Sequence, residues 1–269
     1  MLKDGQPEGG ATMASENATE ADMSNHAVSG SGSERARLGK LLWEVNPRKA
    51  QEIEEQLREF IAEPDYPCVG AKSVLARNEL DVLIACDLQS AWDDLRIHQR
   101  LLGWSWTYER DPTYLRSLAI VFERPLRLTE EEFESALWDR LQSLADKDHW
   151  RGQSYDKNVS PDPADPHFSL SFGGQAYFVV GLHPNSSRPA RRFAYPALIF
   201  NLHDQFERLR ADGRYSKIRS TVLERDRKIA GDINPMLQVH GDGSEARQYS
   251  GRVVPDDWKC PFDDKRSKS

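Results

Sequence analysis

The chain lacks the features that most quickly assign a sequence to a class of protein. Its 269 residues contain no apolar run near the roughly 18 residues that a membrane-spanning helix needs, so we expect no membrane partner. Only three cysteines occur, Cys68, Cys86 and Cys260, and no two of them form a CxxC pair. Because the N-terminus also lacks the apolar segment of a signal peptide, this sparse, odd cysteine content indicates a protein of the reducing cytoplasm.

An excess of positive charge is also absent. The formal net charge is −7, whereas a nucleic-acid-binding domain usually carries a basic surface, so we expect no nucleic-acid partner. Residues 1–33 contain no aromatic residue and are rich in glycine, serine, alanine and acids, which predicts a disordered N-terminal segment. We expect residues 34–263 to form one domain and residues 264–269 a flexible tail, since a hydrophobic content of 38% is sufficient for a large core.

Several catalytic motifs are missing. The sequence contains no GxxxxGK[ST] phosphate loop, no GxGxxG after a predicted strand, no HExxH and no GxSxG. These absences exclude the most readily recognised nucleotide-binding, dinucleotide-binding, zinc-protease and hydrolase sites, although they do not exclude catalysis.

Apolar patterns predict a fold that mixes helices and strands. Thr129 and Glu132 form a capping-box pattern at the start of an amphipathic helix that reaches Trp150. Short apolar runs predict strands in DVLIACDL, SLAIVFERP, HFSLSF, QAYFVVGL and PALIFNL. These strands do not alternate strictly with helices, so we predict an α+β domain with a mixed or antiparallel sheet flanked by helices.

Histidines and cationic residues follow two of the predicted strands. His183 comes directly after QAYFVVGL and His203 directly after PALIFNL, and imidazole binds metals, haem iron included. The alternative is that each histidine satisfies a local backbone group. Arg188, Arg191 and Arg192 suit the recognition of carboxylates, because guanidinium groups bind them in a bidentate way, but a solvated basic loop would have the same composition.

The stretch INPMLQVHGDGSEARQYSGR, residues 233–252, interleaves glycines with polar side chains and could wrap around a ligand. Glu245 in this stretch could bind a cation, with an ion pair to Arg247 as the structural alternative. Cys260, in WKCPF, is a candidate thiolate ligand, although free cysteine is often only a small buried apolar residue. Cys68, in YPCVGAK, lies at a predicted turn and remains open to either interpretation.

Three blocks of the sequence are distinctive: YPCVGAKSVLA, the run from FSLSFGGQAYFVV to GLHPNSSRPARR and beyond, and SEARQYSGR. Together they resemble the YqcI/YcgG family over about residues 50–263. Family members with assigned roles are haem-dependent N-hydroxylases of guanidine-bearing amino acids. The resemblance implies haem b, dioxygen and conversion of L-arginine, or a related amino acid, to Nω-hydroxy-L-arginine in specialised-metabolite or antibiotic biosynthesis. A non-catalytic haem sensor or carrier is the alternative.

The resemblance also implies roles for individual residues. His183 is the first choice for the axial iron ligand, and the alternatives, in order, are His203, Cys260 and Cys68. The remaining expected roles are propionate or carboxylate binding by Arg188, Arg191 and Arg192, catalysis by Glu245 and Tyr249, and substrate binding by Glu245, Asn234 and Arg247. No flavin or nicotinamide motif is visible, so a separate reductase or a ferredoxin would supply electrons.

Overall fold

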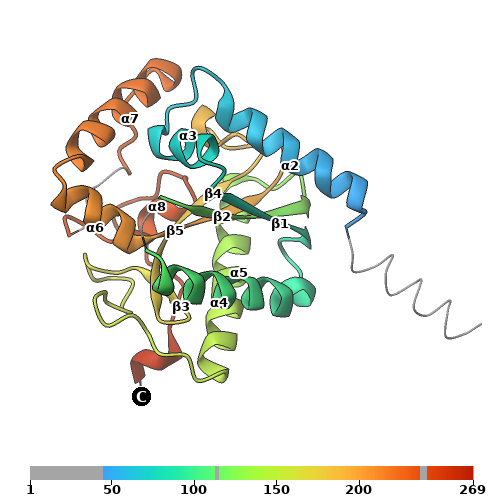
Figure 1. Ribbon diagram of the computed structural model, residues 1–269, viewed down its shortest axis with the longest axis vertical. Coiled ribbons are helices and arrows are strands. Elements are labelled where there is room, and N and C mark those ends of the chain that lie inside the picture. Colours follow the sequence, from blue (N-terminus) through green and yellow to red (C-terminus); the bar gives the residue numbers. More distant parts are fainter. Residues whose placement is uncertain (1–44, 113–114, 237–240, 269) are drawn as a thin grey trace, which may run out of the picture. The chain divides into compact units, whose positions relative to one another are not determined.

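The computed structural model describes residues 45–112, 115–236 and 241–268, all of which belong to one domain (Figure 1). The predicted tail at residues 1–33 lies outside this range. Five strands form one sheet, namely β1 (Leu80–Asp87), β2 (Ser117–Arg124), β3 (Leu170–Phe172), β4 (Gln175–Leu182) and β5 (Ala197–Leu202). Their order across the sheet is β1-β2-β5-β4-β3, with β1 and β2 parallel and the other neighbours antiparallel. The predicted α+β class with a mixed sheet is therefore confirmed.

The main helices surround this sheet. They are α2 (Pro47–Ala62), α3 (Val69–Ala76), α4 (Asp94–Arg110), α5 (Glu130–Trp150), α6 (His203–Ala211), α7 (Tyr215–Ala230) and the short α8 (Ala246–Tyr249). The capping box at α5 is present, because the Thr129 side chain accepts from the Glu132 amide and the Glu132 carboxylate accepts from the Thr129 amide. None of the helices in the described ranges is long and apolar enough to cross a membrane.

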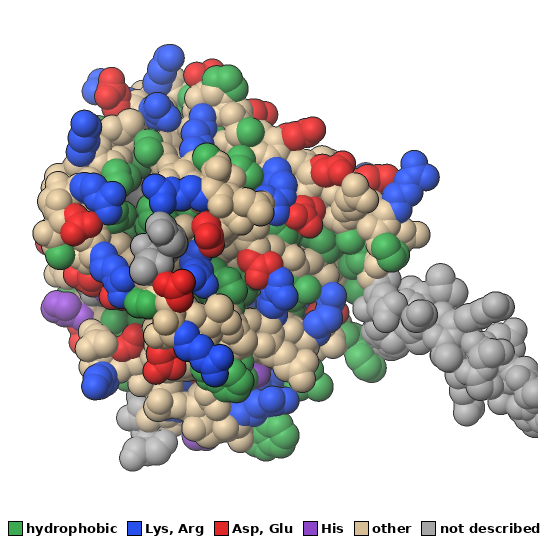
Figure 2. Space-filling view, in the orientation of Figure 1, with side chains coloured by type: hydrophobic (Ala, Val, Ile, Leu, Met, Phe, Trp, Pro, Cys, Tyr) green, Lys and Arg blue, Asp and Glu red, His purple; other side chains and the backbone are tan. Residues whose placement is uncertain are grey.

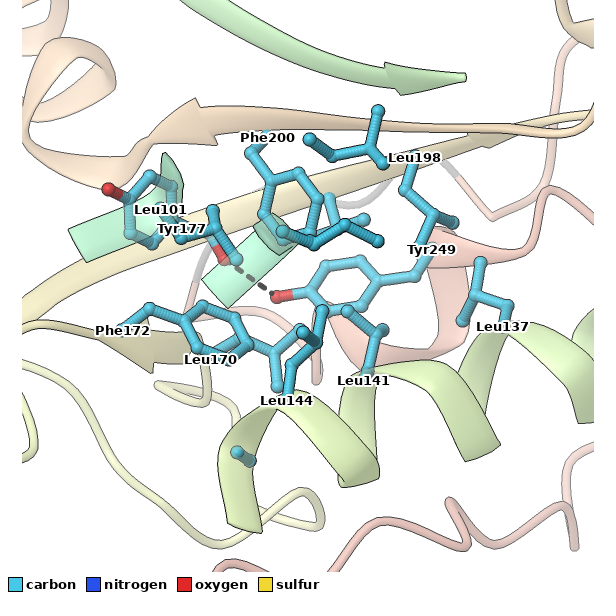
Figure 3. Close-up of a cluster of buried hydrophobic side chains, with 14 of the residues drawn as sticks. Leu101, Leu137, Leu141, Leu144, Leu170, Phe172, Tyr177, Leu198, Phe200 and Tyr249 are labelled. Atoms are coloured by element: carbon cyan, nitrogen blue, oxygen red, sulfur yellow. Dashed lines mark hydrogen bonds between the residues drawn. The ribbon is translucent and has the colours of Figure 1, made fainter. Parts of the chain in front are cut away.

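The alternation of side chains along the strands gives the sheet two apolar faces. On one face, Leu118, Tyr177 and Phe200 belong to a core cluster with residues of α4 and α5. Figure 3 shows Tyr249 of α8 lying in this cluster, close to leucines of α5. On the other face, Val121 and Leu182 pack in a second cluster with residues of α2 and α3. The core is therefore divided by the sheet, and the second face is the one that positions the cavity described below.

The C-terminal residues differ from the expectation of a flexible tail. The Arg266 side chain donates to the Asp148 carboxylate at the end of α5 and, at 2.9 Å, to the carbonyl of Ser171 in β3. Asp264 is buried and accepts further hydrogen bonds from Arg266. A composition of charged residues predicts solvent exposure, but here the opposite charges pair with groups of the domain and hold the segment in place.

Gly181 is required by a close approach between β4 and its neighbours. A Cβ atom at this position would lie 2.8 Å from Phe133 Cε1 and 2.9 Å from the backbone oxygen of Tyr249. We expect Gly181→Ala to lower the free energy of unfolding by about 1–3 kcal/mol, since the backbone of α8 cannot give way cheaply. Denaturant titration measures this change. Gly103→Ala, at an open position in α4, is the matched control and should instead raise it by about 0.5–1 kcal/mol; similar effects of both substitutions would contradict the packing argument.

Candidate functional site

A cavity of about 290 Å³ lies on the α2/α3 face of the sheet. Phe178, Val180 and Leu182 of β4 alternate toward it, and residues of α3, α6 and α7 complete its largely apolar walls. Its polar and charged wall residues include Cys68, Ser117, Arg188, Arg191, Asn201, Gln205, Arg210, Arg219, Asp226, Asn234, Glu245 and Gln248. A concave apolar site with a few convergent polar groups is typical of a small-molecule binding site.

The cavity brings together parts of all three sequence blocks that carry the resemblance. Cys68 comes from the turn before α3, Arg188 and Arg191 from the loop after β4, and Asn234 and Glu245 from the segment before α8. The other residues with expected roles are not among the described residues that line it, and these are His183, Arg192, His203, Arg247, Tyr249 and Cys260.

His183, the first choice for the iron ligand, has a different environment. The residue is 1% exposed, and its ring stacks on Phe133 of α5, with the ring centroids 4.3 Å apart and the planes at 18°. Burial lowers its pKa to about 4, so the ring is neutral at neutral pH. The expectation that His183 ligates iron is not supported by this geometry, because α5 occupies the space against its ring and the residue is off the cavity wall.

The second and third choices also lie outside the cavity lining. His203 begins α6, and its Nε2 is 3.7 Å from Oε1 of Glu245, so it contacts a cavity carboxylate without lining the cavity. Cys260 packs against the core on the α4/α5 face of the sheet, where burial raises the pKa of its thiol to about 12. An inert thiol in an apolar environment fits the structural alternative for Cys260.

Cys68, the fourth choice, is the candidate ligand that faces the cavity. It is the N-cap residue of α3, and its Sγ accepts from the backbone N–H of Ala71 at 3.4 Å. Burial raises the pKa of this thiol, whereas the backbone N–H groups of Ala71 and Gly70 and the Arg191 guanidinium oppose that rise. Burial is the largest of these effects, so the pKa of Cys68 stays above its usual value and the residue is a thiol; a bound metal would displace its proton.

The three arginines have different partners. Arg191 donates to the carbonyls of Gly181 and Tyr249, both at 3.1 Å, and to that of Gln248 at 3.0 Å, so it joins β4 to α8. Burial lowers its pKa to about 10, which leaves it charged at neutral pH. Arg188 donates to Asp232 at 2.5 Å. Arg192 donates to the carbonyls of its own loop and is turned away from the cavity lining, so its expected role in binding a cofactor is not supported.

Glu245 is held in a buried network. Its Oε2 accepts from Ser169 Oγ at 2.5 Å and lies 3.4 Å from the Tyr249 hydroxyl, which also lies 3.2 Å from the carbonyl of Tyr177 (Figure 3). Its Oε1 faces His203. Burial raises the pKa of Tyr249 well above its usual range, so this hydroxyl keeps its proton. Tyr249 is therefore not a wall residue, and it contacts wall residues such as Glu245 and Arg191 from behind.

Asn234 and Arg247 differ in what they can offer a ligand. Asn234 is buried at the cavity wall. Its Oδ1 accepts from the Met236 amide at 3.0 Å, so its side-chain amide nitrogen is the group that could donate to a ligand. Arg247 donates to several carbonyls between Val254 and Trp258, with the shortest bond, to Pro255, at 2.7 Å. Its expected role in substrate binding is not supported, since this guanidinium organises the C-terminal segment.

One wall residue that sequence reasoning missed is Asp226 of α7, which is 5% exposed. It stands in the charged run LERDRK, which has the composition of a solvated helix. The signal that could have found it is its spacing, because Ile218, Val222 and Asp226 follow one another every four residues and so share one face of the helix.

Comparison with known proteins agrees with the sequence blocks. A model of the YqcI/YcgG family matches residues 57–263, which include all of the blocks that meet at the cavity. No curated protein and no solved structure gave a significant match to the chain. Because the family match covers most of its length, the chain belongs to the YqcI/YcgG family.

Proposed function

We propose that this protein is a haem-dependent oxygenase of the cytoplasm that N-hydroxylates the guanidino group of L-arginine or a related amino acid. The observation that carries the proposal is the meeting of Cys68, Arg188, Arg191, Asn234 and Glu245 at one apolar cavity. These side chains come from distant segments, and they combine a soft metal ligand, cations for carboxylates, and a carboxylate for a cation.

The residues at the cavity fit a haem in their chemistry. Cys68 would hold the iron, since cysteine thiolate is an established haem ligand and amide groups already point at this sulfur. Arg188 and Arg191 supply positive charge for propionates or for the carboxylate of a substrate. The bound haem would supply the activation of dioxygen.

The volume of the cavity sets a condition on that fit. About 290 Å³ lies just below the roughly 300–1,000 Å³ typical of small-molecule sites, and a porphyrin with a substrate needs more. A haem bound together with its substrate would therefore require the cavity to widen.

Glu245 would orient the guanidinium and take up its proton. A guanidinium must lose a proton as the nitrogen is oxygenated, and a carboxylate in hydrogen-bonding reach assists that loss. Ser169 and Tyr249 contact Oε2 of this carboxylate, and Oε1, which lies 3.7 Å from His203 Nε2, is the oxygen that would meet the guanidinium.

A basic surface beside the cavity favours an acidic protein as the electron donor. Residues 203–230, which include α6 and α7, contain eight Lys or Arg and five Asp or Glu, although the whole chain carries a net charge of −7. Figure 2 shows Lys and Arg side chains over the region where Figure 1 draws α6 and α7. Complementary charge steers association, so a ferredoxin or an acidic reductase is the partner that this surface fits.

The decisive experiment is expression of the full chain with a haem precursor, followed by an absorption spectrum and a titration with L-arginine. We expect a Soret band that L-arginine shifts, and a product that has gained one oxygen atom when dioxygen and a reducing system are supplied. Mass spectrometry of the product measures the second result. A purified protein without a Soret band despite haem supply would contradict the proposal, and a haem protein without turnover would reduce it to haem binding.

A further inference from the structure

The helix α7 packs on the cavity rather than on the core of the domain. Asp226 is the only buried residue among its sixteen, whereas Ile218 and Val222 remain half-buried and line the cavity. The four-residue spacing places all three side chains on one helix face. The face that α7 turns to the cavity therefore consists of an apolar stripe that ends in a carboxylate.

The Asp226 carboxylate has an unused acceptor atom. Its Oδ2 is buried and forms no hydrogen bond to any residue within the described part of the chain. The nearest ion-pair partner is Nη1 of Arg188, at 3.9 Å, which is beyond hydrogen-bonding distance. Burial raises the pKa of this carboxyl group, while Arg188 and Arg191 oppose that rise and Asp232 adds to it. A buried carboxylate oxygen without a hydrogen bond is costly, and such costs are typical of groups that meet a ligand.

Arg188 presents the opposite charge at the same wall. It is 6% exposed, and its hydrogen-bonded partner Asp232 has a side chain that is 72% exposed. The positive charge of Arg188 is therefore paired with a solvent-exposed carboxylate, while Arg188 itself lines the cavity. The cavity wall thus carries an anion and a cation 3.9 Å apart that do not satisfy each other.

We propose that Asp226 and Arg188 form a clamp for the head group of a free α-amino acid. Asp226 accepts hydrogen bonds from the α-ammonium group and Arg188 donates to the α-carboxylate, so each side chain meets its opposite charge. The apolar stripe of Ile218 and Val222 lies along the same helix face, where it can contact the methylene chain of the ligand. Only the identity of the ligand's far end, a guanidinium at Glu245, rests on the proposed function.

The test compares ligands that lack one charged group of the head. Calorimetric titration of the full chain with L-arginine, with agmatine, which lacks the carboxylate, and with 5-guanidinopentanoate, which lacks the ammonium group, measures each contribution. We expect L-arginine to bind at least about tenfold more tightly than either analogue, because each lost charge-assisted hydrogen bond is worth about a factor of ten or more. In Asp226→Asn, the affinity for L-arginine should fall by a similar factor while that for 5-guanidinopentanoate stays unchanged.

Glu224→Gln is the matched control, since this exposed carboxylate lies on the same helix and should leave all affinities unchanged. Unchanged binding of L-arginine by Asp226→Asn, or an equal loss for both ligands, would overturn the clamp. If L-arginine fails to bind but L-citrulline or L-norleucine binds with the same dependence on Asp226, the proposed function fails and the clamp stands. If none of these α-amino acids binds, the clamp is refuted.

Discussion

Replacing Asp148 by alanine is expected to lower the free energy of unfolding by about 3–5 kcal/mol. The Asp148 side chain is fully buried at the end of α5, where it accepts from His98 Nε2 at 2.8 Å and from Arg266. It also accepts from the Gly173 amide at 3.1 Å, at the turn between β3 and β4. The substitution removes the partner of a buried guanidinium and leaves a turn amide without its acceptor, and both losses are costly. Denaturant titration measures the change.

Asp146→Ala is the control for this prediction. Asp146 lies two residues earlier on α5 and pairs with Lys265, also of the C-terminal segment, at 2.9 Å. Both of these side chains are more than a third exposed, so the pair is screened by solvent and its removal should cost less than about 1 kcal/mol. Equal effects of the two substitutions would show that the buried network does not anchor the C-terminus.

Replacing Cys68 by alanine is expected to abolish haem retention. Cys68 is the candidate ligand that lines the cavity, and alanine offers no donor atom for iron. The fold should survive, since the thiol contributes one long hydrogen bond at the start of α3 and the side chain is only half-buried. The measurement is the Soret absorbance per protein after purification with haem supply, with circular dichroism as the check of folding.

Cys260→Ala and His183→Ala are the controls, because neither side chain lines the cavity. Both variants should keep the Soret band, although His183→Ala removes a ring stacked on Phe133 and should unfold at lower denaturant concentration. Loss of haem in His183→Ala with retention in Cys68→Ala would reverse the assignment of the ligand.

The strands were predictable because their apolar runs are short and bounded by turn residues. QAYFVVGL corresponds to β4 in full, and ALIFNL, within PALIFNL, corresponds to β5. The pairing of β1 with β2 in parallel could not be derived in this way, because it depends on contacts between strands that are separated by α4. Local pattern specifies an element, whereas tertiary packing decides which neighbour it meets.

The site was predictable in its segments but not in the roles of single residues. The position of His183 after a strand is visible in the sequence, but the Phe133 ring that covers it comes from a helix fifty residues earlier. Cys68 shows no distinguishing local pattern, and only the fold shows that the start of α3 opens on the cavity. The burial of Asp226 could not be predicted from the charged residues around it in the sequence, because burial depends on what the helix packs against.

The arrangement of α7 has a consequence for how the protein would respond to its ligand. A helix that fully buries no apolar side chain gains little stability from the domain, so we expect α7 to open at lower cost than the helices that pack in the core clusters. A ligand that fills the cavity would cover Ile218, Val222 and Leu223 and so provide the apolar contact that the helix lacks. Part of the free energy of binding would then stabilise the folded state of α7. Ligand binding would therefore increase the order of this helix.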